Sequence, residues 1–435
     1  MSSPQTITPD VYEAILKCNR CGFCQPFCPT YMATRDETQL SRGRVHLVRQ
    51  IYEGRYDWDF DPALIEKVND CLLCGACTQN CPGSVETADI MRAFREDYID
   101  HKGLSLLIKL MYRGMLSRRE RLERLSALMR LYDKSGLRNS PPVKAVQKAF
   151  SLLEYLDSFL PSDTGVPARR TLAGKISPAG EPRLKVRFFL GCASNVFGPR
   201  VVTRVVDYLV SQGIEIEITD NVCCGEPHRT AGDLAEVRRL ADINARKVFA
   251  GDYDFIITDC ATCGHALKIY DQFVTPDSEE SRIVAAGLDK VMEINTFILE
   301  HARPDQAALA SPAGLAGLKV TYHDPCHSVR GLEIKEAPRE ILRSLPGLEF
   351  VEMEGADSCC GGAGSYGVTH RAVAEKIAEK KLTQVQATGA SVLATSCPSC
   401  ILQLGAAVKR AGLDIKVVHP SALLAEAVRA AGNRP

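Results

Sequence analysis

Cysteine is the residue type whose number and spacing in this chain could do chemistry. The 435 residues include 18 cysteines, eight of them within residues 18–81 and ten within residues 192–400. Thiolates are ligands for zinc and for iron–sulfur clusters, whereas a reducing cytosol disfavours disulfides and a chain of this length does not need them. Metal binding is therefore the favoured interpretation of these cysteines.

The first eight cysteines form one run twice, C-x2-C-x2-C-x3-C-P, at residues 18–29 and 71–82. This is the spacing of bacterial ferredoxins, in which three close thiolates hold one 4Fe–4S cluster and the fourth, before the proline, ligates the other. Zinc sites use separated C-x2-C pairs, so this run fits zinc poorly. We predict two 4Fe–4S sites: site A with Cys18, Cys21, Cys24 and Cys81, and site B with Cys71, Cys74, Cys77 and Cys28.

The other ten cysteines lie in an internal repeat whose near-constant offset indicates a duplication. In each copy β-like runs alternate with helical runs, which predicts a parallel sheet with helices on its faces. Sites in such sheets form beyond the carboxyl ends of the strands, and each cysteine landmark follows a predicted strand. At offsets of 134, 136 and 137 residues, residues 185–192, 221–227 and 255–264 match residues 319–326, 357–363 and 392–401.

Each copy holds a single cysteine, a vicinal Cys-Cys-Gly and a C-x2-C pair. Adjacent cysteines in a strand point to opposite faces, so the vicinal pair needs a turn, for which Gly225 and the pair Gly361-Gly362 supply backbone freedom. The C-x2-C pair is expected at a helix N-terminus, with Asp259 or Ser396 as the cap, where the helix dipole favours thiolates. We predict two further iron–sulfur sites: site C with Cys192, Cys223, Cys224, Cys260 and Cys263, and site D with Cys326, Cys359, Cys360, Cys397 and Cys400.

Sites C and D have two alternatives to clusters, buried structural cysteines and a vicinal disulfide. Either would leave the repetition of all five positions unexplained, and ten thiolates converging at two places are too many for zinc. Four histidines lie close to these cysteines in sequence and could donate hydrogen bonds to cluster sulfur, shuttle a proton or serve the structure alone. They are His228, His265, His323 and His327.

The segment without cysteines, residues 99–183, is expected to be helical. Residues 103–132 have apolar residues at helical spacing, a second helix is expected over 143–159, and residues 161–183 are rich enough in Pro, Gly and Ser for a linker. Between residues 101 and 150 twelve Lys and Arg face three Asp and Glu. This basic strip could face acidic lipid or an acidic partner, or it could be a solvated helix face packed on the neighbouring domain.

The remaining features exclude several classes of function. A net charge of zero argues against a nucleic-acid partner, and no secretory signal or membrane span is recognisable, so a cytoplasmic location is predicted. Contact with the inner face of a membrane stays open. No G-x-G-x-x-G follows a predicted strand and no P-loop is found, so flavin is not expected in this chain. A chain without flavin or hydride chemistry needs a partner to dehydrogenate a substrate.

A family resemblance covers nearly the whole chain. Its motifs are CNRCGFCQPFCPTY at 18–31, RGRVHLVRQIYEG at 42–54, CLLCGACTQNCPGSV at 71–85, YHDPCH at 322–327 and CCGGAGSY at 359–366. The order of motifs resembles the iron–sulfur subunit of glycolate oxidase and the partner subunit of D-lactate dehydrogenase, which belong to the Cys-Cys-Gly (CCG) domain iron–sulfur oxidoreductases. It is also similar to the small subunit of anaerobic glycerol-3-phosphate dehydrogenase and to the cysteine-rich catalytic subunit of heterodisulfide reductase.

The resemblance implies an electron-transfer subunit of a flavin-dependent 2-hydroxy acid dehydrogenase, which passes electrons from an FAD subunit to a quinone or another carrier. An electron-transfer or membrane subunit is a further implied partner. The family also implies an alternative, because heterodisulfide reductases hold noncubane 4Fe–4S clusters in complete CCG sets and reduce a disulfide there. This chain keeps all ten CCG cysteines. A third class is an electron hub or assembly subunit without a soluble substrate. Sites C and D could hold noncubane or ordinary cubane clusters.

The predicted fold class is α+β multidomain. An N-terminal α-helical ferredoxin domain over residues 1–98, with a helix near 44–53, resembles that of respiratory dehydrogenase subunits. A helical basic segment and linker follow over 99–183. Two duplicated α/β CCG domains with parallel sheets then occupy residues 184–305 and 306–435.

Overall fold

The computed structural model describes residues 8–160, 165–172, 174–311 and 316–432, so the first residues of the chain and part of the expected linker lie outside it. The N-terminal third is helical, and its core gathers around Trp58 and Phe94, whose ring centroids lie 5.0 Å apart. The expected helix near residues 44–53 is confirmed as α3. The helices are α1 (Pro9–Leu16), α2 (Pro29–Thr34), α3 (Ser41–Tyr52), α4 (Pro62–Asn69), α5 (Ala76–Gln79) and α6 (Thr87–Lys102).

The middle segment is helical as predicted, but both expected helices are interrupted. The first breaks at a π-helical turn, Tyr112–Leu116, because two side chains there are anchored elsewhere. The Tyr112 hydroxyl bonds the Ser365 hydroxyl at 2.8 Å, and the Ser117 hydroxyl lies 2.9 Å from His228 Nε2. The second breaks at Phe150, whose backbone is not helical. The resulting helices are α7 (Leu106–Met111), α8 (Arg119–Lys134), α9 (Pro141–Ala149) and α10 (Ser151–Ser158).

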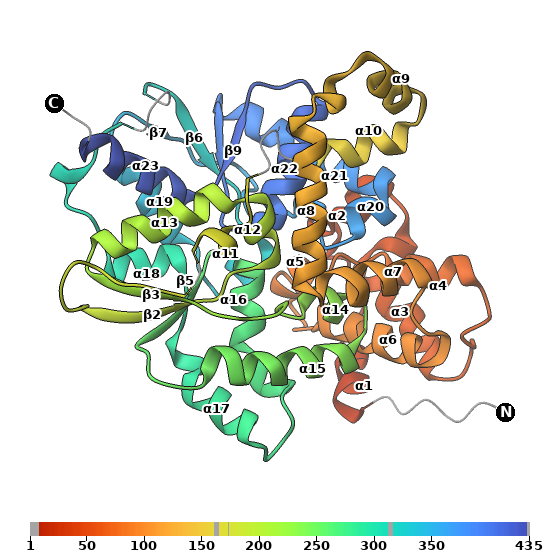
Figure 1. The fold of residues 1–435 in the computed structure, drawn as a ribbon. Coiled ribbons are helices and arrows are strands. Elements are labelled where there is room, and N and C mark those ends of the chain that lie inside the picture. The colour runs from red at the N-terminus through yellow and green to blue at the C-terminus, as the bar shows by residue number, and fades with distance from the viewer. Residues whose placement is uncertain (1–7, 161–164, 173, 312–315, 433–435) are drawn as a thin grey trace.

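Part of the basic strip faces the neighbouring domain. Arg113 holds both carboxylate oxygens of Asp233, at 2.6 and 2.8 Å, and Arg119 pairs with Asp220 at 2.6 Å. These ion pairs fasten the segment to the first CCG domain, which is what the packed-face interpretation expects. In Figure 1, α8 runs between the two sheets and the N-terminal helices. Among the described residues, no helix combines the length and the apolar character needed to cross a bilayer.

Strands in the described residues of the C-terminal half form two sheets, with orders β1-β3-β2-β4-β5 and β7-β6-β8-β9. All pairs are parallel except β1 with β3, so β3-β2-β4-β5 and β7-β6-β8-β9 share one topology, as a duplication requires. The edge strand β1 comes from the segment expected to be a linker. The strands are β1 (Lys175–Ile176), β2 (Leu184–Phe188), β3 (Ile214–Ile218), β4 (Phe255–Thr258), β5 (Val291–Glu293), β6 (Lys319–Tyr322), β7 (Glu349–Phe350), β8 (Val392–Ala394) and β9 (Lys416–Val418).

A shared core joins the two sheets. It contains residues from strands of both and from α13 (Pro199–Ser211), α18 (Ile294–His301), α19 (Glu336–Ser344) and α23 (Pro420–Gly432). Strand residues alternate in the manner of a sheet covered on both faces, since Ile257 points into this core and Ile256 into the second one. Figure 1 shows these helices and strands on one side of the molecule and the N-terminal helices on the other.

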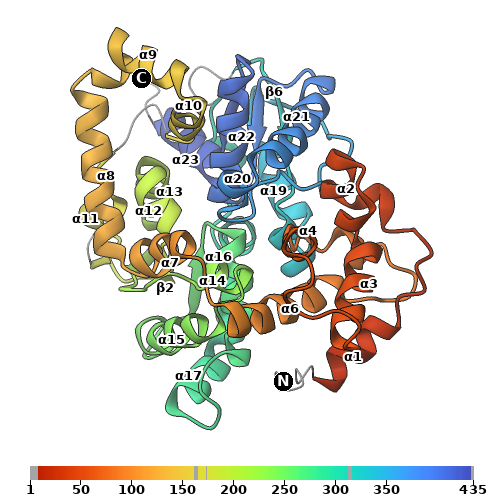
Figure 2. The ribbon, with the colours of Figure 1, turned by 90° about the vertical axis from the view of Figure 1, so that its right-hand side faces the viewer.

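The N-terminal domain packs mainly on the second CCG domain. Helix α2 lies beside α21 (Arg371–Ala387), as Figure 2 shows. His370 pairs with Asp70 at 2.6 Å, and the Arg330 guanidinium joins Gln79 of α5 to Asp357. This docking brings the second ferredoxin-type run against the second CCG domain.

One buried ion pair gives a prediction for the stability of the second CCG domain. Arg339 is 1% exposed and holds both carboxylate oxygens of Asp324, each at 2.8 Å, and Glu352 at 2.7 Å. Replacing Arg339 by Met should cost about 3–5 kcal/mol, because Asp324, also 1% exposed, would keep a buried, unpaired charge. Urea unfolding of the cluster-loaded protein would measure the loss.

The matched control is Arg343→Met, on the same helix. Arg343 pairs with Glu336 at 3.3 Å on the surface, and such pairs contribute about 0–1 kcal/mol. An equal destabilisation by the two substitutions would contradict the assignment of a buried charge pair.

Candidate iron–sulfur sites

The two ferredoxin-type runs fold into loops of the same backbone conformation. The third residue of each loop is left-handed, Arg20 with φ +60° and Leu73 with φ +52°. The residue after the second cysteine is also left-handed in both, Gly22 with φ +90° and Gly75 with φ +71°. A non-glycine residue rarely adopts positive φ, so its presence at the same position of both loops indicates that the loop geometry is imposed by the cysteine spacing.

These loops bring the cysteines together in the exchanged pattern expected from the sequence. One small cavity is lined by the four cysteines of site B and another by those of site A, and Cys77 lines both. Cys28 of the first run lies in the cavity of the second run, and its sulfur is 3.2 Å from the Thr30 hydroxyl. The first cavity is lined by Cys28, Cys71, Cys74 and Cys77, and the second by Cys18, Cys21, Cys24, Cys77 and Cys81.

The five cysteines of each CCG set also meet. In site C the thiols of Cys192, Cys223, Cys224, Cys263 and Cys260 contact one another in that order. In site D the same order runs through Cys326, Cys359, Cys360, Cys400 and Cys397, with 3.5 Å between the sulfurs of Cys360 and Cys400. All are buried except Cys192 and Cys326, which are half-buried. Each set therefore forms one compact group of sulfur donors.

The backbone around these groups fits a bulky sulfur-bound group. The turn after each vicinal pair uses a left-handed glycine, Gly225 with φ +91° and Gly361 with φ +84°, and the Gly361 N–H donates to the Cys359 sulfur at 3.4 Å. A Cβ added at Gly191 would lie 3.3 Å from the Cys263 sulfur. Soft donors, backbone N–H groups aimed at sulfur and close glycine approach are what iron–sulfur ligation needs.

One local prediction is wrong. The cap positions of α16 (Ala261–Lys268) and α22 (Pro398–Arg410) are occupied by Cys260 and Cys397 themselves, not by Asp259 and Ser396. Asp259 instead accepts a hydrogen bond from the Ser194 hydroxyl at 2.9 Å, because burial of this segment offers it a side-chain partner. The first cysteine of each C-x2-C pair thus lies directly at a helix N-terminus, where the dipole favours a thiolate.

Buried cations accompany the thiols. Lys381 is 1% exposed, lies near Cys359 and Cys360, and donates to the Gly355 carbonyl at 2.7 Å; burial lowers the pKa of its ammonium group to about 8. Arg44 and Arg95 take the same role beside Cys71. Sequence analysis missed Lys381, although the pattern contained a signal. It occupies the apolar stripe of α21, in register with Ala374, Ile377, Ala378, Leu382 and Val385.

The four histidines have different surroundings. His228 is fully buried between Ser117 and Asp233 and serves the packing of the helical segment. His323 lies within 4.8 Å of the sulfurs of Cys360 and Cys400, and burial lowers the pKa of its ring to about 3, so it is neutral there. His265 and His327 stack with centroids 5.3 Å apart, and His327 Nδ1 is 3.8 Å from the Cys326 sulfur.

The four sites adjoin one another in the order A, B, D, C. Cys77 lines both cavities of the N-terminal domain, and the Cys74 thiol of site B contacts the Cys359 thiol of site D. The Cys397 thiol of site D in turn contacts Cys260 of site C. A cleft of about 480 Å³ opens beside the junction of sites B and D, lined by Cys74, Cys326, His265, His327, Arg229 and Arg330 among others.

Comparison with known proteins agrees with this construction. The cysteine-rich (CCG) domain model matches residues 186–268 and 320–405, and the 4Fe-4S dicluster domain model matches residues 14–85. The probable glycolate oxidase iron-sulfur subunit of Bacillus subtilis is 31% identical over 95% of this chain and 94% of that protein. The second of the two fumarate reductase (CoM/CoB) chains of Methanothermobacter marburgensis is 29% identical over 97% of this chain and 74% of its own length.

Two further likenesses are more partial. Lactate utilization protein A of Geobacillus sp. is 29% identical over 55% of this chain and 99% of that protein. A crystal structure of a hypothetical protein from Helicobacter pylori superimposes with a TM-score of 0.53 at 11% identity, covering 97% of this chain and 73% of that one, which shows a shared fold alone.

Fold and site together define an iron–sulfur protein in which a ferredoxin-type dicluster domain is joined to duplicated cysteine-rich domains. The chain belongs to the family of the glycolate oxidase iron–sulfur subunits. It is an iron–sulfur electron-transfer subunit of an oxidoreductase, as its relatives are.

A glycine substitution tests the space at site C. Gly191→Val should lower the iron and labile sulfide bound per chain, because the added side chain would meet the Cys263 sulfur. Gly405→Val is the matched control, since no atom lies within 4 Å of a Cβ built there. Equal iron content in Gly191→Val and the wild type, with both folded by circular dichroism, would contradict a cluster at this position.

Proposed function

We propose that this chain carries electrons for a flavin-dependent 2-hydroxy acid dehydrogenase. A partner FAD subunit would oxidise glycolate or D-lactate, and the electrons would pass through sites A, B, D and C in this chain to a quinone or another carrier. The observation that carries the proposal is the uninterrupted contact of the four cysteine sets through Cys77, Cys74–Cys359 and Cys397–Cys260. The names of the relatives support the choice of substrates.

The proposal assigns all eighteen cysteines as ligands. Sites A and B would each hold a 4Fe–4S cluster with the exchanged fourth cysteine, and sites C and D would each hold a further iron–sulfur cluster, noncubane or cubane. Such clusters supply one-electron transfer. The domain bounds proposed with these sites are 1–98, 99–183, 184–305 and 306–435.

The protein around the sites would tune and insulate them. Each transfer between neighbouring sites would be short, because thiols of successive sites touch. Lys381, Arg44 and Arg95 offset the negative charge of buried thiolates, which favours the reduced state of nearby centres. Buried surroundings also keep water from the sulfur atoms of sites C and D.

The proposal requires partners. We place the flavin in another subunit and the chain in the cytoplasm, with contact at the inner face of the membrane where electrons leave for a quinone. Anaerobic purification of the tagged chain from its host should recover a near-equimolar FAD protein. Glycolate or D-lactate should then bleach the cluster absorption of the complex. A cytochrome or thiol-system partner without flavin would overturn this function.

The second candidate is reduction of a disulfide at sites C and D. Two observations favour it: the complete set of ten CCG cysteines, and the cleft that reaches the half-buried Cys326 beside His327. Disulfide-dependent oxidation of a reduced viologen dye by the isolated chain would establish this activity. Its absence in a protein with full iron content would exclude it.

Exchange of the fourth ligands between sites A and B is testable by chelation. Site A includes the exposed Cys21, so an iron chelator should remove its iron faster than that of the buried site B. Cys81→Ala should abolish the fast phase of iron release, and Cys28→Ala should diminish the slow phase. The opposite pattern would show that each fourth cysteine serves its own run.

A further inference from the structure

The two ferredoxin-type loops are alike in conformation and opposite in exposure. In the second loop the residues next to the second cysteine are covered: Leu72, Leu73 and Ala76 are 5%, 7% and 5% exposed. They pack with Cys359, Tyr366 and Ile377 of the second CCG domain, and Cys74 touches Cys359. This loop therefore shows how the chain couples a ferredoxin-type site to a neighbouring centre, through the second cysteine and an apolar contact around it.

The equivalent surface of the first loop has no cover within the described residues. Cys21 occupies the position of Cys74, and it alone is exposed among the eighteen cysteines, all of which the structure describes. Phe23 stands where Ala76 stands and is 63% exposed. We define the Cys21 face as Cys21 with its exposed apolar neighbours Leu16 (46%), Phe23 (63%) and Phe27 (45%).

Charge and size narrow the occupant of this face. Lys17 and Arg20 are exposed beside it, and no Asp or Glu occurs from residue 17 to residue 35. An apolar centre with a basic rim fits a protein surface with an apolar centre and an acidic rim. The cleft at sites B and D suits a small molecule, whereas the Cys21 face is an open convex surface that only a macromolecule can cover.

We propose that the Cys21 face is the docking surface for the flavoprotein subunit and the entry for electrons into site A. The inference rests on the proposed function, and it adds the direction of flow, from A through B and D to C. Oxidation of one 2-hydroxy acid to the 2-oxo acid would deliver two electrons and two protons to the flavin. The electrons cross the Cys21 face one at a time, and the protons leave to solvent from the flavoprotein.

Substitution of Phe23 tests the surface. In the complex purified anaerobically through the tagged chain, Phe23→Asp should slow bleaching of the clusters by glycolate or D-lactate about tenfold or more, or release the flavoprotein, because a carboxylate would enter the apolar centre of the interface. Phe27→Asp should act in the same direction. Lys17→Glu should slow association and weaken its dependence on salt. Iron content and reduction by dithionite should not change, since both phenylalanines are exposed.

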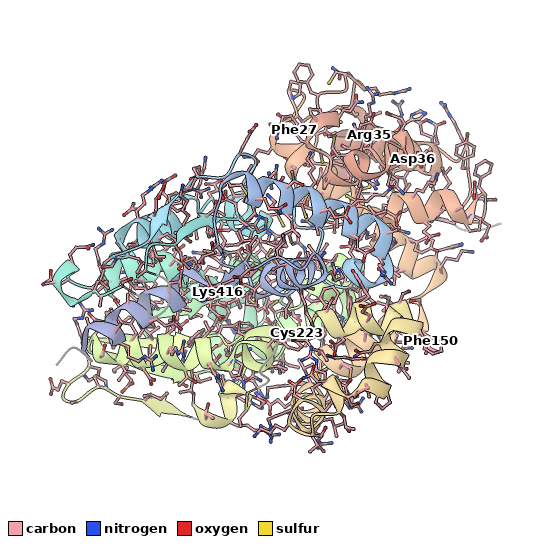
Figure 3. The ribbon with its side chains drawn as sticks, turned by 90° about the horizontal axis from the view of Figure 1, so that it is seen from above. Phe27, Arg35, Asp36, Phe150, Cys223 and Lys416 are labelled. Atoms are coloured by element: carbon pink, nitrogen blue, oxygen red, sulfur yellow. The ribbon has the colours of Figure 1, made fainter. Side chains whose placement is uncertain are left out.

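Phe150→Asp is the matched control, because Phe150 is also 63% exposed and lies on the helical segment, far from Phe27 in Figure 3. Wild-type coupling in Phe23→Asp and Phe27→Asp, or an equal loss in Phe150→Asp, would overturn the docking surface while the dehydrogenase function stands. A wild-type complex without flavoprotein would overturn both. Loss of binding to phosphatidylglycerol vesicles with coupling intact would make the face a lipid contact and overturn the proposal as well.

Discussion

The contact between the two C-x2-C loops is the constraint on which the C-terminal half depends. The Ala261 N–H donates to the Ser396 carbonyl at 3.1 Å, and Thr262 Oγ1 lies 3.4 Å from the Cys397 sulfur. Ser396 Oγ also meets Asn295 and Tyr322, at 2.9 and 2.8 Å. Because both loops follow the carboxyl end of a strand, this contact places the cysteine edges of the two sheets against each other, and sites C and D become neighbours.

The same contact explains why the two sheets share one core. Helices α13 and α18 from the first copy pack with α19 and α23 from the second, so neither copy buries its apolar face alone. A duplicated domain with its own complete core could sit anywhere relative to its twin. Here the shared core holds the two halves in a single arrangement, which protects the distance between sites C and D.

Burial of thiols carries an electrostatic cost that the chain offsets with cations. A buried thiolate without a partner is unfavourable in a low dielectric, and the structure sets Lys381, Arg44 and Arg95 close to cysteines that would carry charge. Each cation is anchored by carbonyl groups, as Lys381 is by Gly355 and Arg44 by Lys67. The arrangement is costly without a charged neighbour, which is consistent with sites that are meant to be filled.

Sequence alone determined the chemistry of this protein. Cysteine spacing is a local property, so the ferredoxin-type runs, the CCG turns with Gly225 and Gly361, and the duplication could all be recognised without a structure. Strand β3 was predicted at its observed bounds, because alternation of Ile and Glu over 214–218 is a local signal. The helix breaks at Tyr112–Leu116 and Phe150 were not predictable, since distant partners such as Ser365 and His228 impose the first of them.

Only the tertiary structure decided how the sites connect. Contacts such as Cys74–Cys359 and Cys260–Cys397 join residues that are far apart in the chain, and no spacing rule reaches across domains. The exposure of Cys21 and the burial of Cys74 were equally hidden, because the two runs have the same spacing and differ in what the rest of the chain places over them. Ligand chemistry is written in neighbouring residues, whereas the order of the sites depends on the packing of whole domains.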